Sequence, residues 1–152
     1  MKHRNIRWQP DAEVADNLRE ALPQMAKHYF RAGRKAAKKK AAAEDLHQFR
    51  LRTKHFRYLL EFFAPFYGRR LTRPMDSLRH MQTLLGELND YAVTRAMLRS
   101  EPETAKLMSH LDTLETARRH EFRAYWREIF DKEGQQERWM ALLSAPGQPR
   151  IS

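Results

Sequence analysis

Five side chains that can hold an anion recur on one side of a single predicted helix. They are His47, Arg50, Lys54, Arg57 and Tyr58. At about 100° per residue they fall within roughly a 100° sector of the helix. Arginine directs two donors toward phosphate oxygens, lysine adds a compact charge, and imidazole and phenol add directional donors. The pattern therefore predicts non-covalent binding of closely spaced oxyanions.

The opposite side of this helix is apolar, which predicts a core face behind the cations. The acids Glu44 and Asp45 suit the first turn of the helix, because they complement its dipole. We expect the helix to run to about Tyr67, to be irregular near Pro65 and to end at Gly68. Its expected core face consists of Phe49, Phe56, Leu59, Leu60, Phe63 and Tyr67.

Two further cationic stripes are predicted on other helices. One lies within residues 27–38 and the other within residues 118–127. Like charges three or four residues apart cost a helix about 0.2 to 0.5 kcal/mol per pair, so an anion that offsets the repulsion would explain them. The triplet 38–40 fits a solvated helix end equally well. The first stripe is Lys27, Arg31, Arg34 and Lys38, and the second is Arg119, Arg123 and Arg127 beside Arg118.

The remaining apolar periodicity places helices on both sides of this one. A first helix is expected from Pro10-Asp11 to about Lys40, with a kink or a break at Pro23. A third begins after Pro74 and is expected to be interrupted at residue 86 or 89, before another periodic segment over 91–98.

The C-terminal third predicts one long helix and one short one. Ser100 followed by Glu103, with a proline between them, predicts a capping box that opens the long helix. That helix should run to about Lys132 and end at Gly134, and a short helix should surround Trp139. No stretch alternates with period two, so no sheet is expected.

These elements predict an all-α protein, an antiparallel bundle of four to five principal helices. Residues 11–143 are expected to form a single helical domain. An N-terminal segment of residues 1–10 precedes it, and a loose C-terminal tail of residues 144–152 follows it.

Composition limits the partners and the chemistry. The 152 residues carry 29 Lys and Arg against 19 Asp and Glu, a net charge of +10, which predicts attraction to polyanions. There is no cysteine, and no signal peptide or membrane span is readable, so a cytoplasmic soluble protein is expected. Glycine-rich phosphate loops and metal-binding motifs are absent from the sequence. We therefore expect no catalysis, no metal and no cofactor.

Two motifs carry a resemblance to a known family. The pattern H-x-x-R-x-x-x-K-x-x-R-Y followed by L-E-F-F spans residues 47–63, and L-G-x-x-N-D lies within residues 81–90. Together they resemble the CHAD family, the conserved histidine α-helical domain, over about residues 18–98. The resemblance implies binding of inorganic polyphosphate in a basic channel without an established reaction. It also implies that His47, Arg50, Lys54, Arg57 and Tyr58 line the channel, and that Asp90 orients a neighbouring basic side chain.

The sequence departs from the family pattern in three ways. His55 stands where the family often has a second cation, and Arg52 where a small apolar residue is usual. Typical CHAD domains contain two related bundles around the channel, each with its own histidine helix. This chain has one such helix and is more similar to the second half. A homodimer that completes the basic groove is therefore expected.

Two other functions stay open at this level. Non-specific RNA or DNA binding would use the same basic surface, with aromatic residues for stacking. A metal-dependent phosphohydrolase would need acids near the stripe, and Glu61, Glu87 and Asp90 are the available ones. We expect these acids to pair with Arg and Lys instead. Association with polyphosphate granules also stays open.

Overall fold

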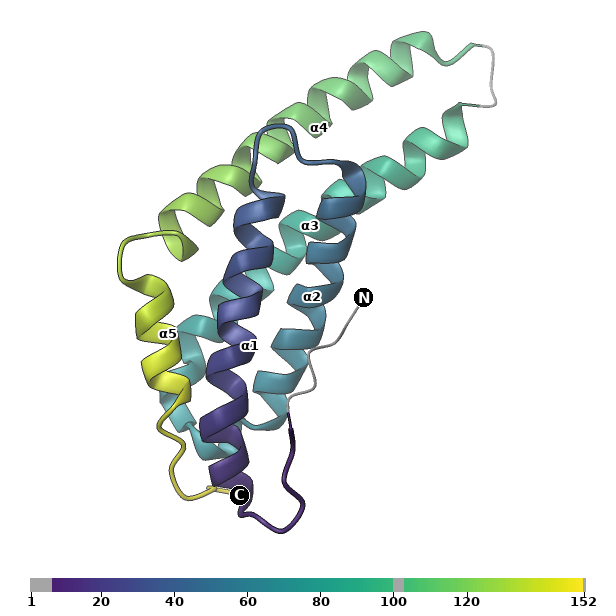
Figure 1. The fold of residues 1–152 in the computed structure, drawn as a ribbon. Helices are drawn as coiled ribbons and strands as arrows, with labels where there is room; N and C mark the ends of the chain where they lie inside the picture. Colours follow the sequence, from purple (N-terminus) through teal and green to yellow (C-terminus); the bar gives the residue numbers. More distant parts are fainter. Residues whose placement is uncertain (1–6, 100–102, 152) are drawn as a thin grey trace.

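The computed structural model describes residues 7–99 and 103–151, and these form an all-α bundle. The five α-helices are α1 (Val14–Ala36), α2 (Ala43–Phe62), α3 (Thr72–Leu98), α4 (Ala105–Tyr125) and α5 (Gln135–Leu143). Short 3-10 turns cover Ala64–Phe66 and Gly68–Leu71, and a π-helical turn covers Trp126–Phe130. The described residues contain no strand. The predicted helical bundle is confirmed (Figure 1).

Helix α1 continues through Pro23, so of the kink or break expected there, the break does not occur. Pro23 is buried inside the helix, and Leu22 and Ala26 on either side of it are also buried. This apolar stripe packs along the whole helix, and the packing offsets the hydrogen bond that proline removes. The helix is shorter than predicted at both ends, because it begins at Val14 and ends at Ala36.

Helix α3 is also continuous, so the predicted interruption at Gly86 or Asn89 is wrong. The buried residues Leu85 and Leu88 lie on both sides of Gly86 and keep this face packed. A glycine costs a helix interior about 1 kcal/mol relative to alanine, which is less than the burial of such side chains contributes.

The long C-terminal helix begins later than predicted. Helix α4 starts at Ala105, and residues 100–102 of the expected capping box lie outside the described residues. After Tyr125 the helix changes to the π-helical turn and ends before Gly134, which has a φ of 77°. Helix α2 ends at Phe62, earlier than the expected Tyr67. The irregularity expected near Pro65 is present as a 3-10 turn, and Gly68 has a φ of 61°.

An aromatic cluster forms the core between α1, α2, the π-helical turn and α5. Tyr29 stacks on Phe49 with ring centroids 5.0 Å apart, and Trp126 stacks on Phe130 at 5.1 Å. On the predicted core face of α2, Phe49, Phe56, Leu60 and Tyr67 are buried. Leu59 and Phe63 are half-buried. The apolar side of α2 thus fixes which side faces outward.

The outer ends of α3 and α4 extend beyond the other helices as a two-helix arm, residues 91–98 and 105–114 (Figure 1). Arg95 joins the two helices through ion pairs with Asp112 at 2.6 Å and Glu115 at 2.5 Å. Closer to the bundle, Arg118 pairs with Glu87 at 2.7 Å. None of the described helices combines the length and apolar character that crossing a membrane requires.

Candidate anion-binding site

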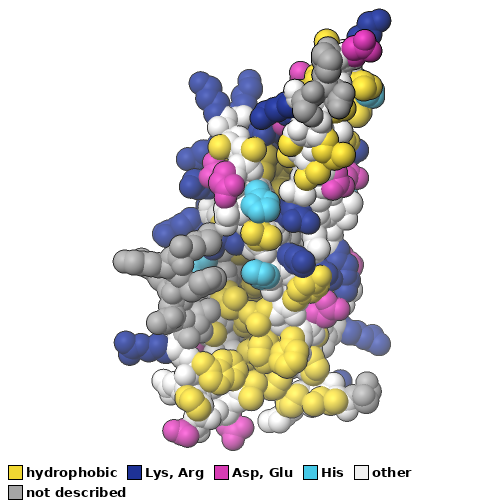
Figure 2. Space-filling model, turned by 90° about the vertical axis from the view of Figure 1, so that its right-hand side faces the viewer, with side chains coloured by type: hydrophobic (Ala, Val, Ile, Leu, Met, Phe, Trp, Pro, Cys, Tyr) yellow, Lys and Arg dark blue, Asp and Glu magenta, His cyan; other side chains and the backbone are white. Residues whose placement is uncertain are grey.

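Helix α2 presents the predicted anion-binding side chains on its outward side. His47 and Tyr58 are exposed, and Arg50, Lys54 and Arg57 are half-buried. Figure 2 shows histidine and basic side chains together on the face to which α2 contributes. We call Arg50, Lys54 and Arg57 with His47 and Tyr58 the α2 stripe. It lies along the seam between α2 and α3.

Arg57 is the most firmly held member of the α2 stripe. Its Nε donates to Oε1 of Gln82 on α3 at 2.7 Å, and its Nη1 lies 3.3 Å from Oε2 of Glu61. The guanidinium carbon lies 4.5 Å from the ring centroid of Tyr58, and Nζ of Lys54 lies 5.8 Å from the same centroid. The Tyr58 ring thus gathers two cations beside the seam, at distances typical of cation–π contacts.

A buried polar link sets the position of α2 against α1. Oγ1 of Thr53 donates to the Phe49 carbonyl at 2.8 Å and lies 3.1 Å from the Tyr29 hydroxyl. Burial raises the pKa of Tyr29, so its phenol stays neutral and hydrogen-bonded. Thr53 lies between Arg50 and Lys54 in the sequence, so this link holds the stripe at a fixed position on the bundle.

Two residues of α3 belong to this seam and were not predicted as site residues. The first is Gln82, the partner of Arg57. The second is Gly86. Because α2 and α3 are antiparallel, moving one turn along α3 from Gln82 reaches Gly86, at the level of Thr53 on α2. A Cβ built on Gly86 meets no atom within 4 Å, so the seam is open there. In the sequence, Gln82 was recognisable as a polar residue at a position where the periodicity predicts an apolar one.

The predicted cations of α1 and of the turn after it lie on a different side of the bundle. Lys27, Arg31, Arg34 and Lys38 are all exposed. Arg34 faces α5, where its Nη2 donates to Gln136 at 2.8 Å and its Nη1 lies 3.5 Å from Asp131. Figure 1 places α5 and α2 on opposite sides of α1. The α1 cations therefore do not join the α2 stripe.

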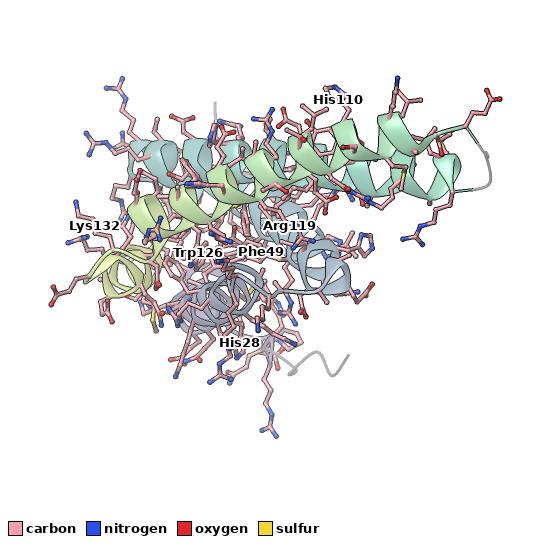
Figure 3. The ribbon with its side chains drawn as sticks, turned by 90° about the horizontal axis from the view of Figure 1, so that it is seen from above. His28, Phe49, His110, Arg119, Trp126 and Lys132 are labelled. Carbon is pink, nitrogen blue, oxygen red and sulfur yellow. The ribbon has the colours of Figure 1, made fainter. Side chains whose placement is uncertain are left out.

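The predicted cations of α4 are also set apart. Arg119 Nη1 donates to the Ala41 carbonyl at 3.1 Å, and its Nε donates to Glu115 at 3.2 Å. Figure 3 shows Arg119 between α4 and the helices beside it. Arg119 thus holds α4 against the connection between α1 and α2. Arg123, one turn further along α4, is half-buried.

Two of the three acids near the stripe, Glu61 and Glu87, pair with cations. Glu61 contacts Arg57 at 3.3 Å, and Glu87 contacts Arg118 at 2.7 Å. Asp90 is exposed on α3. Within the part of the chain that the structure describes, no group of three or more His, Asp or Glu side chains is placed to hold a metal ion.

A cavity of about 780 Å³ lies away from the α2 stripe. The first half of α1 and the segment before it form this cavity, and Arg7, Glu20 and His28 are among its lining residues. Arg19 and Asp16, which also line it, form an ion pair at 2.6 Å. Its walls carry both signs of charge, so it does not extend the cationic surface.

The comparison with family models decides the family. The model described as the CHAD domain matches residues 3–99. The chain belongs to the CHAD family. The CHAD match includes α1, α2 and α3, and with them the α2 stripe, Gln82 and Gly86. Helices α4 and α5, and therefore Arg119 and Arg123, lie outside it. No curated protein and no solved structure matched the chain.

Proposed function

We propose that this CHAD chain binds inorganic polyphosphate along the α2 stripe and catalyses no reaction on it. The observation that carries the proposal is the clustering of Arg50, Lys54 and Arg57 beside the open seam at Gly86. CHAD domains are associated in general with polyphosphate binding. A chain of this function acts where polyphosphate accumulates, in the cytoplasm or on polyphosphate granules.

The geometry suits a linear polyanion. At 1.5 Å per residue, Arg50 to Arg57 extends over about 10 Å of helix axis. Each cation that neutralises a phosphate releases a condensed counterion, and this release favours binding. His47 at one end and Tyr58 at the other add donors, so the stripe can contact several consecutive phosphates.

Nucleic acid is the less favoured ligand because most aromatic residues of α2 are committed elsewhere, Phe62 with its 75% exposure being the exception. Phe49 and Phe56 lie in the core, and the ring of Tyr58 is beside Arg57 and Lys54. Sequence-tolerant binding of single strands relies on free aromatic faces on which bases stack. Polyphosphate has no base and needs only the cations and hydrogen-bond donors.

We also propose that a second copy of the chain completes the site. The α2 stripe lies on an open face, without an opposite wall from the same copy among the described residues (Figure 2). A two-fold dimer presents the same stripe twice across one groove. The longer cationic path would hold long polyphosphate chains better than short ones.

A competition experiment tests the ligand. Fluorescently labelled long-chain polyphosphate is titrated at physiological salt, with single-stranded RNA and duplex DNA as competitors at equal phosphate concentration. We expect RNA and DNA to compete weakly. Equal competition by RNA would show a general polyanion binder, and phosphate release upon addition of Mg²⁺ would show a hydrolase.

A pair of charge-matched variants tests the site. Substituting alanine for Arg50, Lys54 and Arg57 should weaken binding by a hundredfold or more. The control replaces Lys27 and Arg31 on α1 and Lys38 just after it, which removes the same charge, and it should weaken binding only a few-fold. Circular dichroism checks that both variants remain helical. Equal losses in the two variants would mean that binding depends on net charge and not on the α2 stripe.

A further inference from the structure

Large exposed apolar side chains gather at two places in the bundle. Val93, Leu107 and Leu114 lie on the arm, with exposed fractions of 52%, 55% and 38%. Trp8, Tyr58 and Phe62 lie near the end of α2, where Phe62 is 75% exposed. We call the second group the foot patch. Monomeric proteins seldom leave large side chains of this kind grouped in solvent without a partner.

Val93 of the arm and the foot patch share a face with the α2 stripe. On α2, Tyr58 and Phe62 follow Lys54 at four-residue steps, so they continue its outward side. On α3, Val93 follows Gly86 after seven residues, which is about two turns along the same side. Figure 2 shows yellow side chains above and below the histidine and basic side chains of this face. The cations therefore lie between two apolar surfaces.

The foot patch is held in place by rings and backbone hydrogen bonds. Trp8 stacks on Phe63 with centroids 6.3 Å apart, and Phe62 meets the same ring edge-on at 4.9 Å. The segment after α5 braces the turn beneath them, because the Gly147 N–H donates to the Phe66 carbonyl at 2.7 Å. The foot patch is thus an ordered surface and not a frayed helix end.

The arm is equally well supported. Hydrogen bonds from Arg95 to Glu115 and Asp112 join its two helices and raise the pKa of Arg95, so the guanidinium stays charged. Val93 lies two residues before this arginine, about 200° around α3, and so on the side nearly opposite Arg95. Two braced helices therefore hold an apolar surface clear of the bundle, at the opposite end of the face from the foot patch.

From this placement we propose that the arm of each copy packs on the foot patch of a second copy in a two-fold dimer. A two-fold axis that lies in the plane of the face, across its long direction, opposes the two faces and reverses their ends. Each arm then meets the partner copy's foot patch, and this contact occurs twice in the dimer. The two α2 stripes then face one another across a closed channel. The inference rests on the proposed function, because it identifies the surface through which the second copy completes that site.

Charge explains why the second copy that packs on this face is held there by the ligand. Each copy carries a net charge of +10, and the stripes that meet in the channel repel one another. A polyanion between them removes this repulsion, so binding and dimerisation are linked. Apolar contact at both ends and anion-bridged cations in the middle together account for the whole face.

Thiol cross-linking tests the arrangement directly, since the chain has no cysteine. The variants Val93→Cys and Phe62→Cys are treated with a short bismaleimide, each alone and as an equimolar mixture, with and without long-chain polyphosphate. The mixture should give a cross-linked species of about 36 kDa, twice the 18.2 kDa chain, and polyphosphate should increase it. Either variant alone should give little. Efficient cross-linking of one variant with itself, or none in the mixture, would overturn the arrangement.

Light scattering separates this inference from the proposed function. Val93→Glu and Phe62→Glu should each keep the protein monomeric with polyphosphate present, whereas Ala141→Glu on the exposed side of α5 should not. Polyphosphate affinity is measured on the same samples. A wild-type chain that binds polyphosphate with a mass of 18.2 kDa at all concentrations refutes the dimer and leaves the binding function intact.

Discussion

At the scale of single residues, the α2 stripe is prepared for an anion before it meets one. Arg57 is only 15% exposed, and Gln82 and Glu61 fix its guanidinium. A fixed guanidinium loses less side-chain entropy on binding than a mobile one, so more of the interaction energy contributes to affinity. Glu61 also reduces the local positive charge, and a phosphate that approaches Arg57 competes with this carboxylate.

Gly86 provides the sharpest test at this scale. Replacing it with leucine fills the open side of the seam next to the cations, so polyphosphate affinity should fall by about tenfold. The same change should leave the helix intact or stabilise it by up to about 1 kcal/mol, because glycine is a poor helix former. Fluorescence titration measures the affinity, and urea unfolding measures the stability.

The control for this change is Thr83→Leu, one residue beyond Gln82 and exposed on another side of α3. It adds a similar apolar side chain away from the seam and should leave the affinity unchanged. If Gly86→Leu binds like the wild type, the seam is not part of the binding surface.

At the scale of elements, packing between helices decides what local propensity leaves open. Gly33 of α1 is buried against Trp126, and a Cβ at this position would lie 2.0 Å from a carbon of the indole ring. Gly33→Ala should therefore destabilise the fold by about 1 to 3 kcal/mol, as overpacked cores do. Gly86→Ala should instead stabilise the fold, because the added methyl group meets open space and alanine is the better helix former.

Chemical denaturation followed by circular dichroism checks this pair of glycines. The measured quantity is the difference in unfolding free energy between the two variants, because each change adds one methyl group to a helix interior. A Gly33→Ala protein as stable as the wild type would mean that Trp126 does not pack on this side of α1.

Tyr67 gives the fold a dependence on alkaline pH. Its hydroxyl donates to the Leu143 carbonyl at 2.9 Å, and burial raises its pKa from 10.0 to about 12. The positive charge of Arg70 lowers the pKa of Tyr67 and so partly offsets this rise. Because the folded pKa lies above the unfolded one, the stabilisation is complete below pH 10 and is lost as the pH rises toward 12.

The comparison with Tyr67→Phe isolates this residue, since other groups titrate in the same range. Between pH 10 and 11 the wild type should lose roughly 1 kcal/mol more unfolding free energy than the variant does. The measurement is the urea midpoint at a series of pH values. Parallel pH profiles for the two proteins would exclude a role for the Tyr67 phenol.

The elements also show what the sequence can and cannot predict. The outward cations and buried aromatics of α2 follow from its periodicity alone, and the structure agrees. The continuity of α1 through Pro23 and of α3 through Gly86 does not follow, because both depend on packing against neighbouring helices. Gln82 was visible only as a polar residue in an apolar pattern, and its contact with Arg57 requires the register of two helices.

At the scale of the whole molecule, the separation of the cationic stripes matters more than their number. The three stripes are similar in sequence, yet Arg34 contacts the α5 side and Arg119 holds the connection between α1 and α2. Among the described residues, the α2 stripe is the one that borders the open seam at Gly86. The arm could not be foreseen either, since its direction depends on the pairing of Arg95 with Asp112 and Glu115.

The salt dependence of binding reports how many of these cations one ligand neutralises. Each neutralised phosphate contributes a slope of about −0.7 to a plot of log affinity against log salt for a flexible single-stranded polyanion. One copy engaging Arg50, Lys54 and Arg57 predicts a slope of about −2, and two copies across a channel predict about −4. A tenfold rise in salt should then weaken binding about a hundredfold for a monomer and about ten-thousandfold for a dimer. Titrations at four salt concentrations measure this slope, and Val93→Glu, which should remain monomeric, supplies the reference. A slope near zero would contradict electrostatic binding in either form, and equal slopes for both proteins would mean that one copy holds the ligand alone.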